Sequence, residues 1–352
     1  MEKMNDYDII VRFMAKKTML AVIKEKAASG VVIKQIALPK PAKGELLIKV
    51  KAASICGTDI SIYDWTPWAA GHIQPPIVIG HEVVGEVVEI NSNDTNGIKV
   101  GDLVSSETHI FCGYCHQCKT GNRHICENME LFGIGRNGGF AEYATIPVRT
   151  SWKNDRTIPV SWMSTQEPLG NAVHVVTKAD VPGKSVLIFG LGPTGLCAGA
   201  VARAYGAKQV TGINRRAFRR NLAKKMGFDK IYKQLSKEQL GTFDVVLEMS
   251  GASEAIIQAF AAVRLCGKII AFGIPKKEIT IDWGKYLINK ELTIESVFGR
   301  RIWQTWFQVS DLLAAKKVNL GKIITHTFKL SEFEKAMAIM KTGKAGKVVL
   351  IP

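Results

Sequence analysis

An uncharged run from Ser185 to Ala202, SVLIFGLGPTGLCAGAVA, is broken at its centre by three glycines and leaves this chain few possible folds. Gly190, Gly192 and Gly195 follow a short apolar strand and open a helix of small residues. Their G-x-G-x-x-G spacing permits a tight turn, a close backbone approach to a pyrophosphate, and close packing of the helix on its strand. The turn also makes the run buried α/β core rather than a membrane span. Because a second strand, QVTGIN, follows, this region is predicted to bind a dinucleotide.

Three later strand patterns extend this unit: FDVVLEMSG from Phe243, GKIIAFGIP from Gly267 and ELTIESVFG from Glu291. A helical stretch separates the first two, and such alternation predicts a doubly wound parallel sheet. At 352 residues and 47% hydrophobic content, the chain has room for a second domain. Cys197 and Cys266 lie in apolar contexts, and we expect both in the core.

The end of the strand QVTGIN bears on the choice of nicotinamide cofactor. An NAD-binding strand usually ends in a carboxylate that accepts hydrogen bonds from the adenosine ribose. Here Asn214 stands at the end, followed at once by Arg215 and Arg216. A carboxylate would repel the 2′-phosphate of NADP, whereas guanidinium groups can bind it. Arg219 shares a helix face with Arg215, a repulsive arrangement that suggests a nearby anion. We therefore favour NADP, with a solvated helix face as the alternative.

A net charge of +16 raises nucleic acid and anionic membranes as partners. Most lysines are dispersed along the chain, and the one dense cluster is NRRAFRRNLAKK, Asn214 to Lys225. A nucleic-acid-binding helix would show the same pattern, but we expect neither nucleic acid nor membrane as a partner. Residues 1–17 precede the first strand and contain no secretory apolar run, so we interpret them as an extension and expect a cytoplasmic protein.

Four cysteines, Cys112, Cys115, Cys118 and Cys126, lie in one loop with the spacing C-x2-C-x2-C-x7-C. Thiolates at this spacing can converge on one tetrahedral ion, and four of them close its coordination shell. The pattern predicts a structural zinc site. Disulfides or idle thiols are the alternatives, which the absence of a secretion signal disfavours, and the spacing also admits an iron–sulfur cluster.

A second set of possible metal ligands lies upstream of this loop: Cys56 in SICGTD, and His81 and Glu82 in IGHEVVGEVV. A thiolate, an imidazole and a carboxylate leave a coordination position open for water or an alkoxide, as catalytic zinc requires. Each residue alone is weak evidence, because a single cysteine is often inert core and a His-Glu pair often lies at the surface. Their joint appearance before the cysteine loop indicates a second zinc site.

The series CGTD, GHEVVGEVVE, VGDLV, the cysteine loop, GGFAEYATIP, EPLGNAVH and GLGPTG resembles the zinc-dependent medium-chain alcohol dehydrogenases in order and spacing. Within that family, ICGTDISIYDWTPW, LEMSGA, FGRRIWQTW and GKAGKVVL resemble the threonine 3-dehydrogenases. The resemblance implies an α/β architecture with a Rossmann sheet over 167–299. It also implies a discontinuous GroES-like β-barrel catalytic domain over 18–166 and 300–352. NAD(P), two zinc ions, a small-molecule alcohol substrate and a homo-oligomer, commonly a tetramer, are further expectations.

The resemblance also assigns roles around the catalytic zinc. Cys56, His81 and Glu82 would hold the ion, and Glu167 would be an exchangeable fourth ligand or a carboxylate that handles protons beside it. Helix capping is the alternative role for Glu167. Thr58 would pass the alcohol proton outward.

The family continues this proton relay through a histidine three positions after the threonine, and here that position is Ser61. Serine has no group that titrates near pH 7. Either water and ribose hydroxyls carry the proton, or His72 or His109 replaces the missing base, or the substrate is not threonine. Related enzymes have a histidine at the position of His109 near the substrate, although a structural role is equally compatible.

Backbone contacts to the nicotinamide side are implied by resemblance at Gly273, Ile274, Val297 and Phe298. The reaction implied is oxidation of a secondary alcohol, with L-threonine to 2-amino-3-oxobutanoate preferred over an NADP-dependent polyol, sugar or 2,3-diol oxidation. A catalytically silent nucleotide-binding or nucleic-acid-binding relative is the alternative outside enzymes. The predicted cofactor-binding residues are Gly190, Gly192, Thr194, Gly195, Asn214, Arg215, Arg216, Arg219, Gly273, Ile274, Val297 and Phe298.

Overall fold

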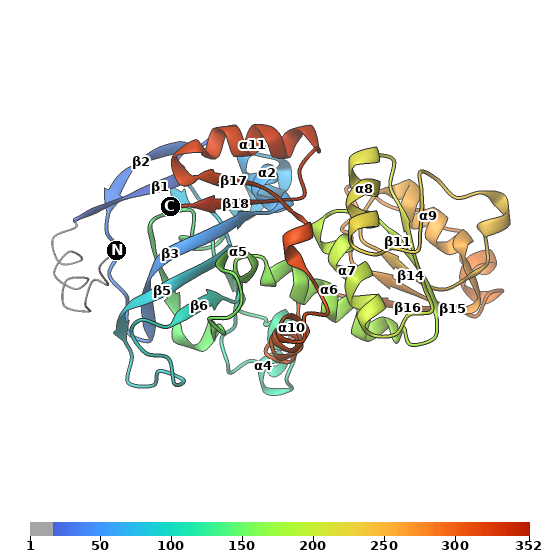
Figure 1. Cartoon of the computed structure of the whole chain (residues 1–352), viewed down its shortest axis with the longest axis horizontal. Helices are drawn as coiled ribbons and strands as arrows, with labels where there is room; N and C mark the ends of the chain where they lie inside the picture. Colours follow the sequence, from blue (N-terminus) through green and yellow to red (C-terminus); the bar gives the residue numbers. More distant parts are fainter. Residues whose placement is uncertain (1–16) are drawn as a thin grey trace. The chain divides into compact units, whose positions relative to one another are not determined.

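The computed structural model describes residues 17–352, which divide into two compact units. Unit 1 holds the described residues up to Gly121, together with Cys126–Glu167 and His326–Pro352 (Figure 1). Unit 2 holds Asn122–Ile125 and Pro168–Thr325. Apart from residue 17, the predicted N-terminal extension lies outside the described residues.

Unit 1 is built around the long strand β3 (Glu45–Ile55), whose sequence ELLIKVKAASI is apolar on both faces. One edge of β3 pairs with β5 (Glu82–Asn91), antiparallel along nearly its whole length. The other edge is shared, because β9 (Tyr143–Pro147) pairs with its first half and β18 (Lys347–Ile351) with its second half. The last strand of the chain thus completes a sheet that the N-terminal part begins.

The strands of unit 1 form one seven-stranded sheet with the order β10–β6–β5–β3–β18–β17, in which β9 also pairs with β3. A three-stranded sheet has the order β2–β1–β4, and the short strands β7 and β8 pair with each other. This antiparallel architecture confirms the predicted GroES-like domain. The other strands and helices of unit 1 are β1 (Thr18–Lys24), β2 (Val32–Ala37), α2 (Gly57–Asp64), α3 (Pro67–His72), β4 (Ile77–Val78), β6 (Leu103–Ser106), β7 (His109–Ile110), α4 (His116–Lys119), β8 (Glu130–Leu131), β10 (Ser151–Lys153), α5 (Val160–Met163), β17 (Ile324–Lys329, from the unit boundary) and α11 (Phe333–Thr342).

Helix α2 is anchored at its C-terminal end by a buried lysine. The ammonium group of Lys24 donates to the carbonyl oxygens of Gly30 at 2.9 Å and Tyr63 at 3.1 Å, and lies 5.1 Å from the ring centroid of Trp65. A cation at this end of a helix is favoured by the helix dipole. The anchoring matters for the site, because Cys56 stands at the opposite end of the same helix.

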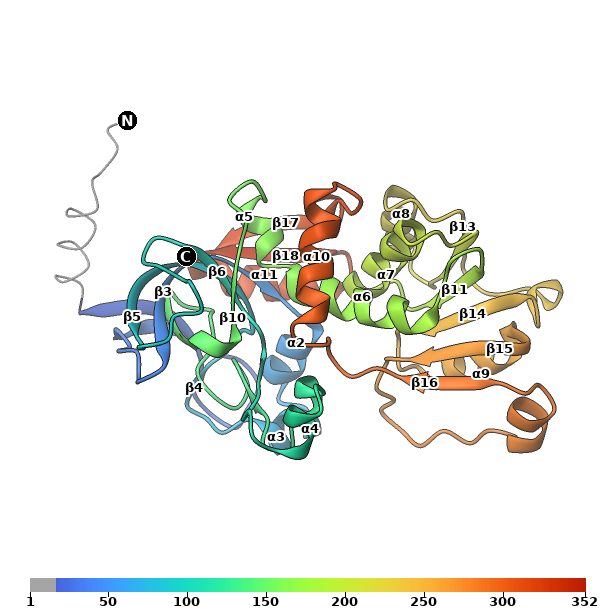
Figure 2. The same cartoon turned by 90° about the horizontal axis from the view of Figure 1, so that it is seen from below.

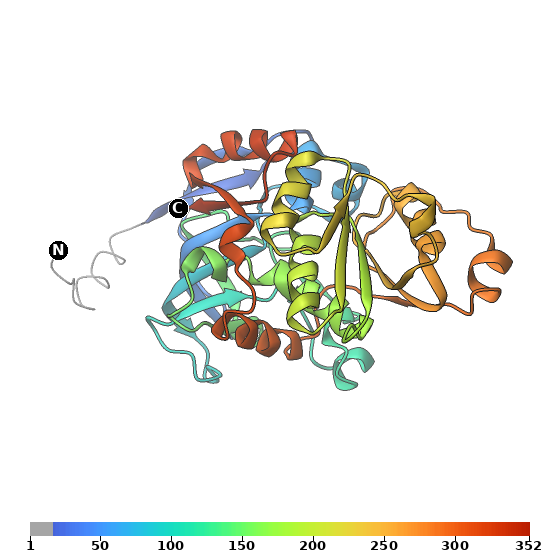
Figure 3. The ribbon, with the colours of Figure 1, turned by 45° about the vertical axis from the view of Figure 1, so that its right-hand side comes forward.

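Unit 2 contains a six-stranded sheet with the order β13–β12–β11–β14–β15–β16, and all its pairs are parallel. Helices α7 and α8 lie side by side on one face (Figure 3), and α9 packs on β14 and β15. Figure 2 shows β14, β15 and β16 next to one another at one edge. The predicted doubly wound α/β sheet is confirmed. Its elements are β11 (Ser185–Phe189), α7 (Pro193–Ala204), β12 (Gln209–Ile213), α8 (Ala217–Lys225), β13 (Lys230–Tyr232), β14 (Phe243–Glu248), α9 (Ser253–Ala262), β15 (Val263–Ala271), β16 (Thr293–Ser296) and α10 (Gln304–Ala314).

The order of this sheet places its topological switch point between β11 and β14. From β11 the chain moves through β12 to β13 on one side, and from β14 it moves through β15 to β16 on the other. In open parallel sheets, ligands bind beyond the carboxyl ends of the strands at such a point. The glycine turn follows β11 directly, so it lies where a dinucleotide is expected.

Two local expectations differ from the structure. Cys197 is buried, but Cys266 is exposed and has a φ of 55°, in a part of β15 where the neighbouring Leu265 is also exposed. The prediction of a core position for Cys266 was therefore wrong, because the irregular backbone there turns the strand outward. Residues 300–325 cluster with unit 2 rather than with the catalytic part. Buried Arg300 makes one contact of this association, because its guanidinium donates to Asn171 Oδ1 at 3.1 Å on α6 (Gln166–Ala179).

Candidate functional site

Strand pairing in unit 1 brings the first predicted set of metal ligands together. Cys56 is the N-cap residue of α2, directly after β3, and Glu82 opens β5 next to Ser54 of β3. His81 immediately precedes β5. The ligand atoms of Cys56, His81 and Glu82 all lie within 4.8 Å of one another. A thiol, an imidazole and a carboxyl group at this spacing match the donor set of a zinc ion with an open position.

Asp59 organises two members of this set. Its Oδ2 accepts a hydrogen bond from the backbone N–H of Cys56 at 2.8 Å, and its Oδ1 lies 3.7 Å from Nδ1 of His81. Burial raises the pKa of Asp59. Burial opposes the charged imidazole, but Asp59 and the Cys56 sulfur outweigh it and raise the pKa of His81 to about 10. Nδ1 of His81 faces the Asp59 carboxylate without a hydrogen bond between them, and Nε2 is the ring nitrogen left for a metal.

Glu82 also contacts a buried lysine that the sequence alone did not indicate. Its carboxylate accepts hydrogen bonds from the Lys347 ammonium and from the Ser54 hydroxyl, and Lys347 also donates to the carbonyl oxygen of Ile55 at 3.2 Å. Both charged groups are fully buried, and burial raises the pKa of Glu82 although Lys347 opposes the shift. The two residues are 265 positions apart, and no local pattern predicts their pairing.

The residues predicted to handle protons occupy different environments. Thr58 is in the first turn of α2, with its Oγ1 3.8 Å from Sγ of Cys56. Ser61 lies one turn further along the same helix. Glu167 is in the first turn of α6, and its charge raises the pKa values of Asp59 and Glu82. Glu167 therefore lies near these residues, but it is not in the group of ligand atoms within 4.8 Å.

The two histidines considered as replacements for the missing base, His72 and His109, lie in different environments. His72 is exposed on α3, where its Nδ1 donates to the carbonyl oxygen of Trp68 at 2.7 Å and its ring stacks on that indole. His109 is buried, and its Nδ1 lies 2.9 Å from Oε1 of buried Glu107. The adjacent Thr108 donates to the carbonyl oxygen of His81 at 3.3 Å, which connects this strand to the first metal set.

The four loop cysteines converge as their spacing predicts. Their sulfur atoms all lie within 4.8 Å of one another, and none is in a disulfide. Backbone N–H groups donate to all four sulfurs; for example, Cys112 N lies 3.2 Å from Cys126 Sγ. Burial opposes ionisation, but N–H donors from Cys115 and Tyr114 lower the pKa of Cys112 to about 6. Four sulfurs with backbone donors form a closed set that suits a structural zinc.

The glycine turn in unit 2 has the shape that a pyrophosphate needs. Gly190 has a φ of 90°, and a Cβ on Gly195 would lie 2.0 Å from the carbonyl oxygen of Gly190. A Cβ on Gly192 would meet nothing within 4 Å, so this backbone borders open space. Gly192 is the N-cap of α7, and no side chain caps the first turn, which contains Thr194. The N-terminus of α7 is therefore bare, as an anion-binding helix end must be.

In the basic segment after β12, Arg220 and Arg219 have different hydrogen-bond environments. Asn214 Oδ1 accepts from the backbone N–H of Arg216 at 2.9 Å, and Arg220 donates to the carbonyl oxygens of Asn214 at 2.9 Å and Arg215 at 2.8 Å. Arg219 differs, because its buried Nη1 has no hydrogen-bond partner among residues 17–352. Burial, and then the charge of Arg216, lower the pKa of Arg219 to about 10. Arg220 thus holds the turn, whereas the buried Nη1 of Arg219 is left without a hydrogen-bond partner among the described residues.

The nicotinamide-side residues predicted by resemblance follow the neighbouring strands. Gly273 and Ile274 come after β15, and Val297 and Phe298 follow β16. Ile274 and Phe298 are 74% and 50% exposed, whereas Val297 is buried and its N–H donates to the carbonyl oxygen of Ala271 at 2.9 Å. These residues therefore lie at the same carboxyl edge of the sheet as the glycine turn.

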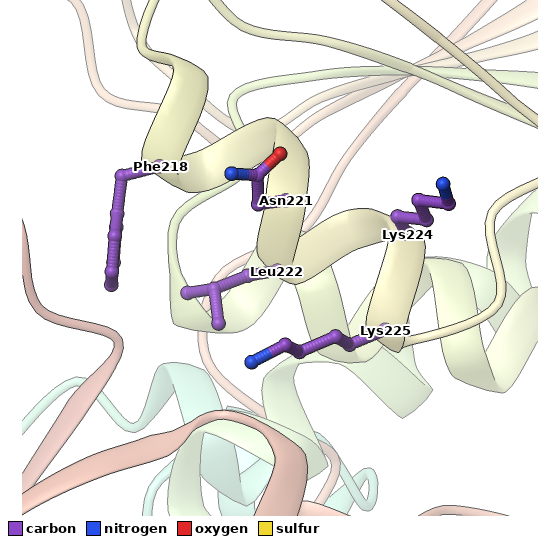
Figure 4. Close-up of a pocket in the computed structure, with 5 residues that line it drawn as sticks. All are labelled: Phe218, Asn221, Leu222, Lys224 and Lys225. Atoms are coloured by element: carbon purple, nitrogen blue, oxygen red, sulfur yellow. The ribbon is translucent and has the colours of Figure 1, made fainter.

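A separate recess is lined by α8 alone: Phe218, Asn221, Leu222, Lys224 and Lys225 (Figure 4). Phe218, Leu222 and Lys225 project to one side of the helix, and Lys224 projects away from them. None of the predicted cofactor-binding residues lines this recess.

No helix within residues 17–352 has both the length and the apolar character needed to cross a bilayer.

Comparison with known proteins gives matches over both units. The family model described as the alcohol dehydrogenase GroES-like domain matches residues 42–156, and the one described as zinc-binding dehydrogenase matches residues 193–315. The L-threonine 3-dehydrogenase of Pyrococcus horikoshii is 45% identical over 343 residues, which cover 95% of this chain and 98% of that protein. The enzyme of the same name from Bacillus subtilis is 42% identical over 96% of this chain and 100% of its own length.

Solved structures show the same architecture. A zinc-binding dehydrogenase of Sinorhizobium meliloti bound to NADP superposes with a TM-score of 0.87 at 27% identity, covering 96% of this chain and 100% of that chain. The 2R,3R-butanediol dehydrogenase of Bacillus subtilis superposes with a TM-score of 0.86 at 25% identity, covering 95% and 99% of the two chains.

Proposed function

This chain belongs to the zinc-dependent medium-chain alcohol dehydrogenases, and we propose that it oxidises the C3 hydroxyl of L-threonine to 2-amino-3-oxobutanoate with NADP as cofactor. The substrate assignment rests on the sequence identity of 40–45%, over nearly the whole chain, to relatives named L-threonine 3-dehydrogenase. The cofactor rests on the arginines after β12. The retained ligand set of Cys56, His81 and Glu82 argues for catalysis rather than for a silent nucleotide-binding relative.

In this proposal Cys56, His81 and Glu82 hold the catalytic zinc, and Glu167 is available as a further ligand or as a proton-handling carboxylate. When bound, zinc lowers the pKa of an alcohol and the nicotinamide accepts a hydride. Asp59 keeps the imidazole of His81 and the N-terminus of α2 in place through its two carboxylate oxygens. The hydroxyl of Thr58, beside the Cys56 sulfur, accepts the alcohol proton and passes it outward.

The proton must leave the site without the family histidine, because Ser61 stands in its place. His72 is a poor replacement, since its Nδ1 is engaged by a backbone carbonyl at the surface. His109 is the better one, because it is buried, its neighbour Thr108 contacts the main chain of His81, and its Nδ1 lies beside Glu107. We assign His109 to the substrate pocket on this basis.

NADP is preferred over NAD in this proposal. Arg219 carries a charge that burial and Arg216 both disfavour, so an anion beside it would be stabilised. The 2′-phosphate distinguishes NADP from NAD and is such an anion. Asn214 removes the carboxylate that would repel it. The structure of the Sinorhizobium meliloti relative bound to NADP is consistent with this choice.

The same arginines account for the basic cluster without a nucleic-acid partner. The assembly we propose is a homo-oligomer, and a tetramer by family resemblance. Strand β16 is the last strand of its sheet, and Leu265, Trp283 and Ile288 in unit 2 are each more than half exposed, which suits burial against a second copy. All seven cysteines are free thiols, which fits the reducing cytoplasm.

A matrix of initial rates tests the substrate and cofactor together. L-threonine, 2,3-butanediol, sorbitol and glucose are each combined with NAD and with NADP. We expect the highest kcat/KM for L-threonine with NADP. A higher value for the diol or a polyol would establish the alternative, an NADP-dependent polyol, sugar or 2,3-diol dehydrogenase, for which Ser61 is the supporting observation.

A further inference from the structure

A buried carboxylate closes the carboxyl end of β14, and no step of the proposed reaction uses it. Glu248 is the last residue of β14 and is 2% exposed. Its Oε1 accepts hydrogen bonds from Ser250 N at 2.9 Å, Ser250 Oγ at 2.5 Å and Gly251 N at 3.2 Å, and its Oε2 accepts from Gly251 N at 3.1 Å. One side chain therefore fixes the whole turn that follows its own strand.

This turn is the common support of two segments predicted to contact the cofactor. A Cβ on Gly190 would lie 2.8 Å from Cβ of Ser250, so the first glycine of the dinucleotide turn rests directly on that residue. On the other side, a Cβ on Gly273 would lie 2.1 Å from Gly251 N and 2.7 Å from Oε2 of Glu248. The ends of β11, β14 and β15 thus approach one another backbone to backbone, with Glu248 beneath them.

Glu248 also holds the third strand end through its main chain. Its carbonyl oxygen accepts from Phe272 N and Gly273 N, both at 3.0 Å. The contacts of this one residue therefore span the carboxyl edge at the switch point between β11 and β14, where open parallel sheets bind their ligands. The side-chain donors are the N–H and O–H groups of the turn, so these groups point at Glu248 and not toward a bound phosphate.

We propose that Glu248 is a positioning residue of the dinucleotide site, which sets the spacing between the Gly190 turn and the Gly273–Ile274 segment by locking the Ser250–Gly251 turn between them. The inference rests on the proposed use of a nicotinamide cofactor. Without both carboxylate oxygens, at least one N–H group of the turn loses its acceptor, and a turn with a buried unsatisfied donor rearranges. Both walls of the site would shift with it.

The same strand supplies a matched control at its other end. Asp244 Oδ2 accepts from Ser185 N and Ser185 Oγ, each at 2.7 Å, in the same way that Glu248 binds Ser250. Asp244 lies near the amino end of β14, away from the carboxyl edge. Glu248→Gln and Asp244→Asn each replace one carboxylate oxygen with an amide NH2 group at little change in volume, and Asp244→Asn also weakens an ion pair with Arg264.

The experiment compares these two variants with the unmodified zinc-loaded chain. NADPH affinity is measured by fluorescence titration, Tm by calorimetry and zinc by metal analysis. We expect both variants to have a lower Tm and unchanged zinc, but only Glu248→Gln to bind NADPH at least tenfold more weakly and to raise the KM for NADP with kcat within threefold. NADPH binding by Glu248→Gln within twofold of Asp244→Asn would overturn the inference.

Further outcomes also decide between the inference and the proposed function. If Glu248→Gln does not fold, Ser250→Ala removes a single hydroxyl donor from the same carboxylate, and we expect NADPH affinity to fall severalfold; unchanged affinity would overturn the inference. If the unmodified chain binds neither NADPH nor NADH, the proposed function fails and this inference with it. If the unmodified chain binds nucleotide and Glu248→Gln binds it within twofold of Asp244→Asn, this inference alone is overturned.

Discussion

Lys347 of β18 and Glu82 of β5 form a buried ion pair, in which the ammonium group contacts both carboxylate oxygens beneath the first metal set. Both side chains are at most 2% exposed. The pair ties the last strand of the chain to the strand that carries a predicted zinc ligand. Glu82 can therefore bind a metal only while its carboxylate is also paired with the Lys347 ammonium group.

Replacing Lys347 should therefore be costly. Lys347→Met leaves the Glu82 carboxylate buried without its cation, and we expect a loss of about 3–5 kcal/mol in the free energy of unfolding. Urea denaturation measures it after a chelator has removed the exchangeable zinc, because a zinc ion at Glu82 would replace the missing cation. Lys341→Met is the control, because its ion pair with Asp64 is partly exposed and should contribute about 0–1 kcal/mol. Equal losses in the two variants would contradict the burial argument.

Metal analysis should distinguish the two cysteine-containing sets. We expect about two zinc ions per chain, one resistant to a chelator and one exchangeable. Cys118→Ser should remove the resistant ion and lower Tm, because four sulfurs hold it in a closed set. Cys56→Ser should remove the exchangeable ion and abolish activity with a smaller change in Tm. A single tightly held ion in the unmodified chain would support the silent relative instead.

The parts of the fold and site that depend on local sequence could be predicted. The glycine turn and the four-cysteine loop each place their chemistry within one short segment, so spacing alone fixes which atoms can meet. Cys56, His81 and Glu82 were predicted from their residue types and from the family resemblance. Pairing of β3 with β5 then explains how they come together.

The supporting contacts could not be predicted, because their partners are separated in the chain and have no periodic pattern. Nothing in the segment GKAGKVVL indicates that Lys347 is buried. Its position beside Glu82 follows only from the pairing of β18 with β3. Glu248 likewise appears as the polar end of an apolar strand, and only the three-dimensional turn shows its hydrogen bonds. Cys266 is exposed together with Arg264 and Leu265, where the pairing of β15 with β14 is irregular, and its apolar neighbours do not indicate this.

Cofactor preference should depend on Arg219 more than on its neighbour. Arg219→Ala should weaken NADP binding at least tenfold and leave NAD binding within about twofold, because the ribose 2′-phosphate loses a charge-assisted partner. Arg220→Ala is the matched control. Its guanidinium donates to two backbone carbonyls, so its loss should lower Tm and weaken both cofactors similarly. Isothermal titration with each nucleotide measures the ratio, and an unchanged ratio in Arg219→Ala would reject NADP selection by this residue.

Stability in mild acid should depend on His174 of α6. Its Nδ1 lies 3.1 Å from the carbonyl oxygen of Gly299, and its ring packs edge-on against His124 with centroids 5.3 Å apart. Burial lowers the pKa of His174 from 6.5 to about 4. Between these values the unfolded chain binds a proton that the folded chain does not, so stability is full above pH 6.5 and falls as the pH approaches 4.

Replacing the titrating ring should flatten this slope. Between pH 6.5 and pH 4, we expect the free energy of unfolding to fall by about 2 kcal/mol less in His174→Gln than in the unmodified chain. One pKa unit corresponds to about 1.4 kcal/mol, and relaxation around the protonated ring offsets part of the total. The free energy of unfolding is measured by urea denaturation at several pH values. Exposed His72→Gln should keep the slope of the unmodified chain. Parallel pH profiles for His174→Gln and the unmodified chain would show that the folded protein accepts the proton at His174 without penalty.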